Sequence, residues 1–306
     1  MGSKRLWAGV YAAVTTKFTE GSELDLAATR KGLQALIKDG IDGLVVLGTC
    51  GETNALEPQE KRTVLDMATE IADGRVPVVA GVSELTTAHA MEFARQAQAL
   101  EADALALLPA LMDVLNEEEL FEHYLRIASS TSLPIILYSN PPVWRTEISL
   151  ALLDRLASVP NIVAIKESAP DSRRFADVIG AFGDRYALMT GRDDKILDDL
   201  TMGAKGWVSG LASAFPKEAT ALLRAHAAGR LEEARRLYRW FTPLLHLDSE
   251  LDLVQSTKLA EQMVGRGSER VRMPRLPLRG ARRSEVVAIV EKAIATRPGK
   301  PVAARL

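Results

Sequence analysis

The chain has 306 residues, 47% of them hydrophobic, and its 38 basic and 40 acidic residues leave a net charge of -2. This near balance argues against a nucleic-acid-binding protein, which would carry a basic surplus. No apolar run reaches the roughly 18 residues that span a bilayer, and the start MGSKRLWAG lacks the apolar core of a secretory signal. The single cysteine, Cys50, cannot form an internal disulfide. We therefore expect a soluble, cytoplasmic protein with no nucleic-acid or membrane partner.

Short apolar runs alternate with amphipathic segments along the first 230 residues. Eight runs are predicted to be buried strands, at residues 7–14, 43–48, 76–81, 103–109, 133–138, 161–166, 186–191 and 203–210. They are continuously apolar, which is typical of parallel strands covered on both faces. Segments with helical spacing lie between them, for example at residues 24–40, 57–74 and 87–102. Eight such units predict an α/β fold, a (β/α)8 TIM barrel within residues 1–230.

A doubly wound sheet is the structural alternative to the barrel. It usually has fewer strands and often a glycine-rich nucleotide loop, and the chain contains no G-x-G-x-x-G pattern. After residue 230 the strand pattern stops, and three helices are predicted at residues 231–248, 251–265 and 283–297. We interpret residues 231–306 as a C-terminal helical extension packed on the barrel.

Polar residues and glycines stand at the ends of several predicted strands, where a TIM barrel has its active-site mouth. They are Gly48, Thr49, Cys50 and Gly51 after the second strand, Tyr138, Ser139 and Asn140 at the fifth, Lys166 at the sixth, Gly191 at the seventh and Ser209 at the eighth. These residues form the candidate site.

Lys166 ends the apolar run NIVAIK. A lysine there often just begins a solvated loop, but strands five and six are neighbours about 4.8 Å apart, which brings Tyr138 and Lys166 to the same mouth. An uncharged amine in a partly dry pocket attacks carbonyl carbons to form a Schiff base, and a phenol beside it can carry protons. The pair predicts catalysis through a lysine imine, with no metal or nucleotide cofactor.

The glycine turn GTCGE gains a role opposite such a lysine. Its backbone amides can hold a carboxylate, so Gly48, Cys50 and Gly51 are predicted to bind substrate. The Thr49 hydroxyl could then relay a proton to Tyr138. We interpret Cys50 as part of the pocket wall, because no histidine is placed to activate it.

The remaining candidates are weaker. Ser139, Asn140 and Ser209 could orient a distal hydroxyl of the substrate, and each could equally be structural; Gly191 is counted with them as a substrate-binding position. The four histidines fall in helical patterns, and no zinc-binding spacing is present. Asp193 and Asp194 precede a predicted helix and are better explained as its N-cap than as cation ligands.

Five motifs, GTCGE, ILYSNP, VAIKES, MTGRDD and GAKGWVSG, resemble in order the dihydrodipicolinate synthase / N-acetylneuraminate lyase superfamily of class I aldolases. The resemblance implies a TIM barrel with C-terminal helices, a homotetramer, and a small 2-oxo acid substrate. By motif, Lys166 would be the Schiff-base lysine, Tyr138 the proton shuttle and Thr49 the relay hydroxyl. The turn at Cys50 would be the carboxylate site.

The chain departs from the synthases at two places. They carry tyrosines after the proline of strand four, where this chain has Ala110 and Leu111. They also carry an arginine five residues beyond the strand-five tyrosine, where this chain has Val143, with Arg145 two residues further on. Both departures weaken the case for lysine biosynthesis.

Four stretches, GWVSGLASAFP, LYRWFTPLLHLD, LVQSTKLAEQ and RMPRLPL, resemble the Δ1-pyrroline-4-hydroxy-2-carboxylate deaminases of hydroxyproline catabolism. Such an enzyme would open the cyclic imine on Lys166, lose the C4 hydroxyl, and release ammonia and 2-oxoglutarate semialdehyde. The alternatives are a dihydrodipicolinate synthase, another pyruvate-dependent aldolase or a 2-keto-3-deoxy sugar acid dehydratase. A metal-dependent barrel hydrolase and a non-catalytic 2-oxo acid-binding barrel are the alternatives from other classes.

Overall fold

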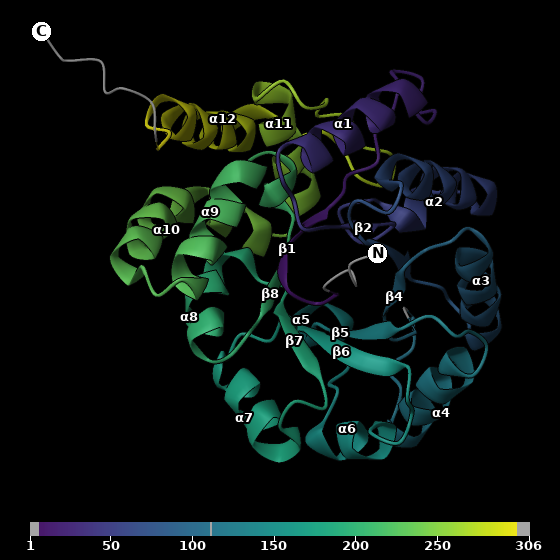
Figure 1. The fold of residues 1–306 in the computed structure, drawn as a ribbon. Coiled ribbons are helices and arrows are strands. Elements are labelled where there is room, and N and C mark those ends of the chain that lie inside the picture. The colour runs from purple at the N-terminus through teal and green to yellow at the C-terminus, as the bar shows by residue number, and fades with distance from the viewer. Residues whose placement is uncertain (1–5, 111, 299–306) are drawn as a thin grey trace, which may run out of the picture.

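The computed structural model describes residues 6–110 and 112–298 (Figure 1). Eight parallel strands pair in chain order and close into a barrel, as the sequence predicts. They are β1 Gly9–Ala13, β2 Gly43–Val46, β3 Val78–Val82, β4 Ala104–Leu107, β5 Ile135–Ser139, β6 Ile162–Glu167, β7 Ala187–Thr190 and β8 Gly206–Ser209. The TIM-barrel prediction is confirmed.

Helices surround the strands and cover their outer faces (Figure 1). They are α1 Leu26–Lys38, α2 Pro58–Ala72, α3 Thr87–Ala99, α4 Glu117–Ala128, α6 Leu150–Leu156, α7 Arg173–Phe182, α8 Ile196–Thr201 and α9 Pro216–Ala227. The short helix α5 Pro141–Trp144 follows β5 directly and lies at the carboxyl ends of the strands instead. Capping residues fix the N-termini of several helices. Asp25 accepts from the Ala28 amide at 2.9 Å before α1, and Pro58 occupies the first turn of α2.

The strands separate two apolar cores. Side chains that point into the barrel form a small inner core, which includes Tyr11, Ile136 and Ala164. Side chains that point outward pack against the helices in a much larger core. Because side chains alternate along a strand, the parity of a residue decides whether it faces the barrel axis or the helices. Only predicted residues whose side chains face the barrel axis can reach the site at the strand ends.

The chain ends in three helices, α10 Leu231–Leu245, α11 Leu253–Met263 and α12 Gly280–Ala295, in agreement with the predicted segments. Helix α10 packs on α9, and α11 packs on α12 and on the turn after β8. An ion pair of 2.8 Å between Arg282 and Asp252 joins α12 to the start of α11. The segment before α11, residues 248–251, lies close to the carboxyl ends of the strands.

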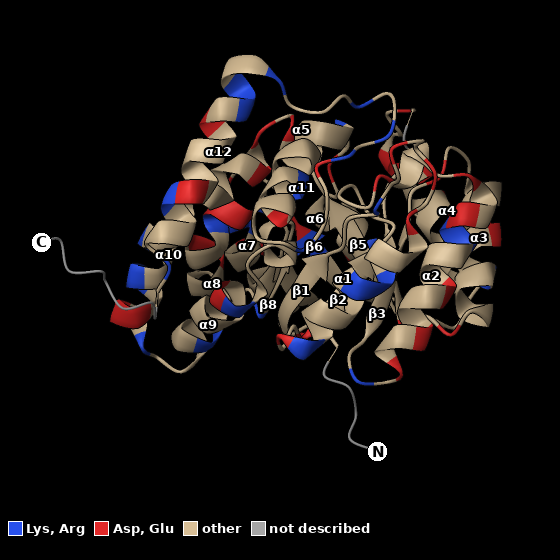
Figure 2. Cartoon of the chain, turned by 90° about the horizontal axis from the view of Figure 1, so that it is seen from above, with Lys and Arg blue, Asp and Glu red and all other residues tan. Residues whose placement is uncertain are grey.

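Charged side chains of both signs are interspersed along the outer helices (Figure 2). Among residues 6–110 and 112–298, no helix is long and apolar enough to span a membrane.

Candidate active site

A cavity of about 450 Å³ opens at the carboxyl ends of the strands. Strand register places two of the predicted residues there, because Tyr138 of β5 is the direct partner of Lys166 of β6. Each stands two residues beyond an inner-core residue of its strand, Ile136 and Ala164, so both side chains face the barrel axis. Both line the cavity.

The Lys166 amine lies on the face of the phenol ring, with Nζ 3.5 Å from the ring centroid of Tyr138. Trp144 of α5 packs edge-on against the same ring at 6.1 Å. Among the described residues, no hydrogen bond or ion pair engages the Lys166 amine. The aromatic pair therefore supports the side chain while its nitrogen stays available to a ligand in the cavity.

Gly191 explains how the lysine side chain crosses the mouth. A Cβ at this position would lie 2.4 Å from Lys166 Cε and 2.3 Å from the Ser168 hydroxyl. Any larger residue would collide with the lysine stem. Ser168 lines the same cavity, and its hydroxyl is buried without a hydrogen-bond partner in the described chain.

The glycine turn after β2 forms the opposite wall. Gly48, half-buried Thr49 and buried Cys50 line the cavity together with Glu52. Burial raises the pKa of the Cys50 thiol, which keeps it protonated and suits a wall residue rather than a nucleophile. Gly51 does not line the cavity: it lies behind the turn, where its carbonyl accepts from the Thr16 hydroxyl at 2.6 Å.

Two predicted serines do not reach the cavity. Ser139 and Ser209 follow inward-facing Tyr138 and Val208 by one residue, so they point outward toward the helices. Ser209 donates to Asp193 at 2.8 Å and accepts from the Ala212 amide at 3.0 Å. Neither serine therefore contacts the cavity.

Asn140, by contrast, lines the cavity and donates to the Tyr138 hydroxyl at 3.2 Å. It thereby fixes the phenol oxygen at the cavity wall. Arg145 is exposed and lies outside the cavity, whereas Val143 lines its rim. Ala110 is buried away from the cavity, and Leu111 lies outside the described residues.

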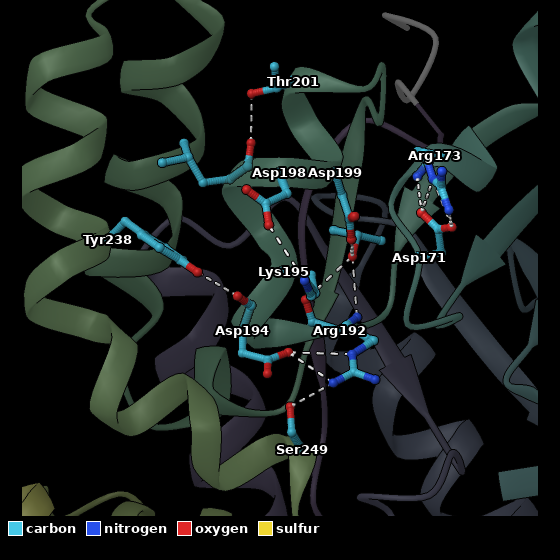
Figure 3. A network of polar contacts seen from close by, with 12 residues as sticks. Asp171, Arg173, Arg192, Asp194, Lys195, Asp198, Asp199, Thr201, Tyr238 and Ser249 are labelled. Atoms are coloured by element: carbon cyan, nitrogen blue, oxygen red, sulfur yellow. Dashed lines mark hydrogen bonds and ion pairs between the residues drawn. The ribbon is translucent and has the colours of Figure 1, made fainter. Parts of the chain in front are cut away.

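The N-cap interpretation of the two acids is wrong. Asp193 accepts from Trp207 and Ser209 of β8 and from the Leu211 amide after it, and the N-cap positions of the helices that start at or after Asp193 are Arg192 and Lys195 instead. Asp194 pairs with Arg192 at 3.4 Å, and the same guanidinium lies 3.5 Å from Ser249 (Figure 3). Among the described residues, no group of three histidine, cysteine or acidic side chains could hold a metal ion.

A buried ionic cluster that the sequence did not indicate supports the glycine turn. Lys258 of α11 is fully buried and donates to the Glu52 carboxylate. Glu52 also accepts from the Arg272 amide at 3.0 Å, and its backbone is left-handed with φ of 52°. The carboxylate therefore holds a strained turn residue in place.

The C-terminal extension completes the cavity wall. Asp248, Val254 and Arg275 line it, as does Arg192 from the turn after β7. The sequence places Asp248 in LYRWFTPLLHLD, but helical periodicity alone did not distinguish it from a surface acid.

The fold and the site define a TIM-barrel lyase of the class I aldolase type, with a lysine and a phenol side by side at the strand ends. A sequence model of the dihydrodipicolinate synthetase family matches residues 6–293, and the chain belongs to this family.

Relatives and solved structures agree with this assignment. The 4-hydroxy-tetrahydrodipicolinate synthase of Geotalea daltonii is 31% identical over 292 residues, 94% of this chain and 99% of the relative. The synthase of Methylacidiphilum fumariolicum SolV superposes with a TM-score of 0.90 at 30% identity, covering 94% of this chain and 96% of that one. A prophage protein of the family from E. coli K12, solved in complex with pyruvate, gives 0.89 at 26% identity, covering 94% and 99%.

Proposed function

We propose that the protein is a lyase that binds a 2-oxo acid, with pyruvate as the simplest case, as an imine of Lys166. The observation that carries this proposal is the Lys166 amine, which lies on the Tyr138 ring at 3.5 Å, in a cavity, without a hydrogen-bond or ion-pair partner in the described chain. A lysine that serves only structure would be expected to have its donors satisfied.

The proposed sequence of steps begins with attack of the uncharged Lys166 Nζ on C2 of the 2-oxo acid to give a carbinolamine. Tyr138 then gives its proton to the C2 hydroxyl, which leaves as water, and Tyr138 becomes a phenolate. The resulting iminium withdraws electrons from C3, and the Tyr138 oxygen removes a C3 proton to give an enamine. The amides of the glycine turn at Thr49 and Cys50 hold the carboxylate, and the Thr49 hydroxyl passes the proton onward. Asn140, which donates to the Tyr138 hydroxyl, stabilises the phenolate while it carries the charge.

For the enamine's further reaction, we propose addition to an aldehyde, which forms a C3–C4 bond. Support comes from the relatives, which are named 4-hydroxy-tetrahydrodipicolinate synthases. The comparisons give no support to the deaminase interpretation drawn from the C-terminal stretches. The synthase reading therefore takes precedence, although Ala110 and Val143 stand where synthases carry tyrosine and arginine.

The test is a reductive trap. The protein is incubated with pyruvate, borohydride is added, and the modified peptide is mapped by mass spectrometry. We expect a reduced pyruvyl group on Lys166 and none in Lys166→Arg, which keeps the charge but cannot form the imine. An adduct on another lysine, or no adduct, would overturn the proposal.

A second assay separates the synthase reaction from the deaminase reaction. Condensation of pyruvate with aspartate semialdehyde is compared with ammonia release from 4-hydroxy-pyrroline-2-carboxylate. We expect condensation to be the faster reaction. Ammonia release with condensation at background would restore the deaminase.

A further inference from the structure

Asp248 brings a carboxyl group from the C-terminal extension into the cavity. It lies in the short 3-10 turn His246–Ser249 between α10 and α11, and it lines the same cavity as Lys166. Its Oδ1 lies only 2.3 Å from the point where a Cβ at position 210 would stand. Gly210 therefore provides the space that the carboxyl group occupies, and the Cys50 sulfur flanks the same point at 3.3 Å.

The surroundings of Asp248 differ from those of its acidic neighbour. No hydrogen bond or ion pair with the described residues engages the Asp248 carboxyl group. Asp193 accepts from Trp207 Nε1 and the Ser209 hydroxyl, both at 2.8 Å, and from the Leu211 amide at 3.1 Å. Donors stabilise a carboxylate anion, and two neighbouring carboxylates resist ionising together. The negative charge therefore belongs on Asp193 and the proton on Asp248.

The charges that face Asp248 agree with this division. Burial and the nearby Asp193 raise the pKa of Asp248 well above its ordinary value, while the Lys166 charge opposes the shift. Burial also raises the pKa of Asp193, to about 6, and its three donors oppose that rise. The other ionisable groups that act on Asp248 or lie against it are Asp194, Arg192 and the Cys50 thiol. Pairs of acids pushed apart in this way mark the acid and the anion of a site.

We propose that Asp248 is the general acid of this cavity and protonates the substrate oxygen that gains charge when the C3–C4 bond forms. This role rests on the proposed lysine imine. The enamine carbon attacks the aldehyde carbon, the C=O electron pair moves to oxygen, and the Asp248 proton is transferred to that oxygen. The products are a hydroxyl group, an iminium on Lys166 and the Asp248 carboxylate. In the reverse direction the carboxylate removes the hydroxyl proton and the C3–C4 bond breaks.

The test separates this step from imine formation. Asp248→Asn keeps the shape but has no acidic proton. We expect its condensation rate to fall by about 10²–10⁴-fold, the usual contribution of a general acid. Pyruvate trapping on Lys166 and deuterium exchange at the pyruvate methyl group in D2O should continue, because neither step uses the Asp248 proton. Asp198→Asn, which removes an exposed acid of α8 outside the cavity, is the control and should match the wild type.

Two readouts exclude a purely structural role. The rate of the wild type should fall on the alkaline side as Asp248 loses its proton, and Asp248→Asn should lack this limb. Formate should restore part of the rate of Asp248→Ala, because it can supply a carboxylic acid in the vacated space. A condensation rate of Asp248→Asn within threefold of the wild type would overturn the role of Asp248. Loss of the pyruvate adduct in the wild type itself would instead overturn the proposed function.

Discussion

Lys166 and Lys258 both place an amine inside the molecule, but their surroundings differ. Lys258 is fully buried, donates to the Glu52 carboxylate and to the Arg270 carbonyl at 2.7 Å, and lies 4.5 Å from the Phe18 ring centroid. Lys166 borders a cavity and is supported by the face of one phenol. The first amine is surrounded by partners, and the second faces open space.

The difference shows that burial of a lysine does not by itself indicate catalysis. Desolvation lowers the pKa of Lys258 to about 8, a shift that would often be read as a sign of a reactive amine. Its donors, however, are used by groups that hold the glycine turn and the loop after α11. A reactive lysine needs an amine without a hydrogen-bond or ion-pair partner and space for a ligand beside it, and Lys166 has both. We infer that Lys258 serves stability and Lys166 serves chemistry.

The largest expected effect is the loss of activity on replacing Lys166. Lys166→Met should lower kcat/KM by more than about 10⁴-fold, because removing a covalent nucleophile removes the whole reaction path. Its free energy of unfolding should stay within about 1 kcal/mol of the wild type, since only the contact with Tyr138 is lost. Turnover assays measure the loss of kcat/KM, and urea unfolding measures the free energy of unfolding. Strong destabilisation would break the contrast with Lys258.

The opposite pattern is expected for Lys258. Lys258→Met leaves Glu52 as an unpaired buried charge and should destabilise the protein by about 3–5 kcal/mol. The double variant Lys258→Met with Glu52→Gln removes that charge and keeps an acceptor for the Arg272 amide, so it should recover part of the loss. Urea unfolding of both variants measures this. If both variants were as stable as the wild type, the ion pair between Lys258 and Glu52 would contribute little to stability.

The sequence predicted the barrel and the position of Lys166, because continuous apolar runs specify buried parallel strands and a lysine at the end of one is conspicuous. It did not separate Tyr138 from Ser139, since a shift of one residue along a strand reverses the direction of the side chain. The pairing of Glu52 with Lys258 spans 206 positions and joins a turn to an amphipathic helix. Such a contact depends on how α11 packs, which no local pattern specifies.

A pH experiment sharpens the assignment of Lys258. The unfolded chain keeps its Lys258 proton up to the ordinary pKa of 10.5, and the folded chain only up to about 8. Between these values the unfolded state binds more protons, so this group makes folding more favourable as the pH rises. The stability difference between the wild type and Lys258→Met should grow by about 3 kcal/mol from pH 8 to 10.5. A constant difference would show that Lys258 keeps an ordinary pKa.

The smallest effect concerns the space that Lys166 needs. Gly191→Ala places a methyl group 2.4 Å from Lys166 Cε and 2.3 Å from the Ser168 hydroxyl, so the lysine stem must move. A displacement of this size should lower kcat/KM by about 10–100-fold, because imine formation requires an aligned amine. The rate of borohydride trapping with pyruvate measures the effect at the lysine itself.

Gly180→Ala is the matched control for this last variant. Gly180 lies within α7 and has no neighbour within 4 Å of an added Cβ, so alanine should raise stability by about 0.5–1 kcal/mol without changing the trapping rate. A trapping rate for Gly191→Ala equal to that of Gly180→Ala would show that the lysine stem adapts freely. The fixed approach of Lys166 along the Tyr138 ring would then not be what makes its amine reactive, and the contrast with Lys258 would rest on the open cavity alone.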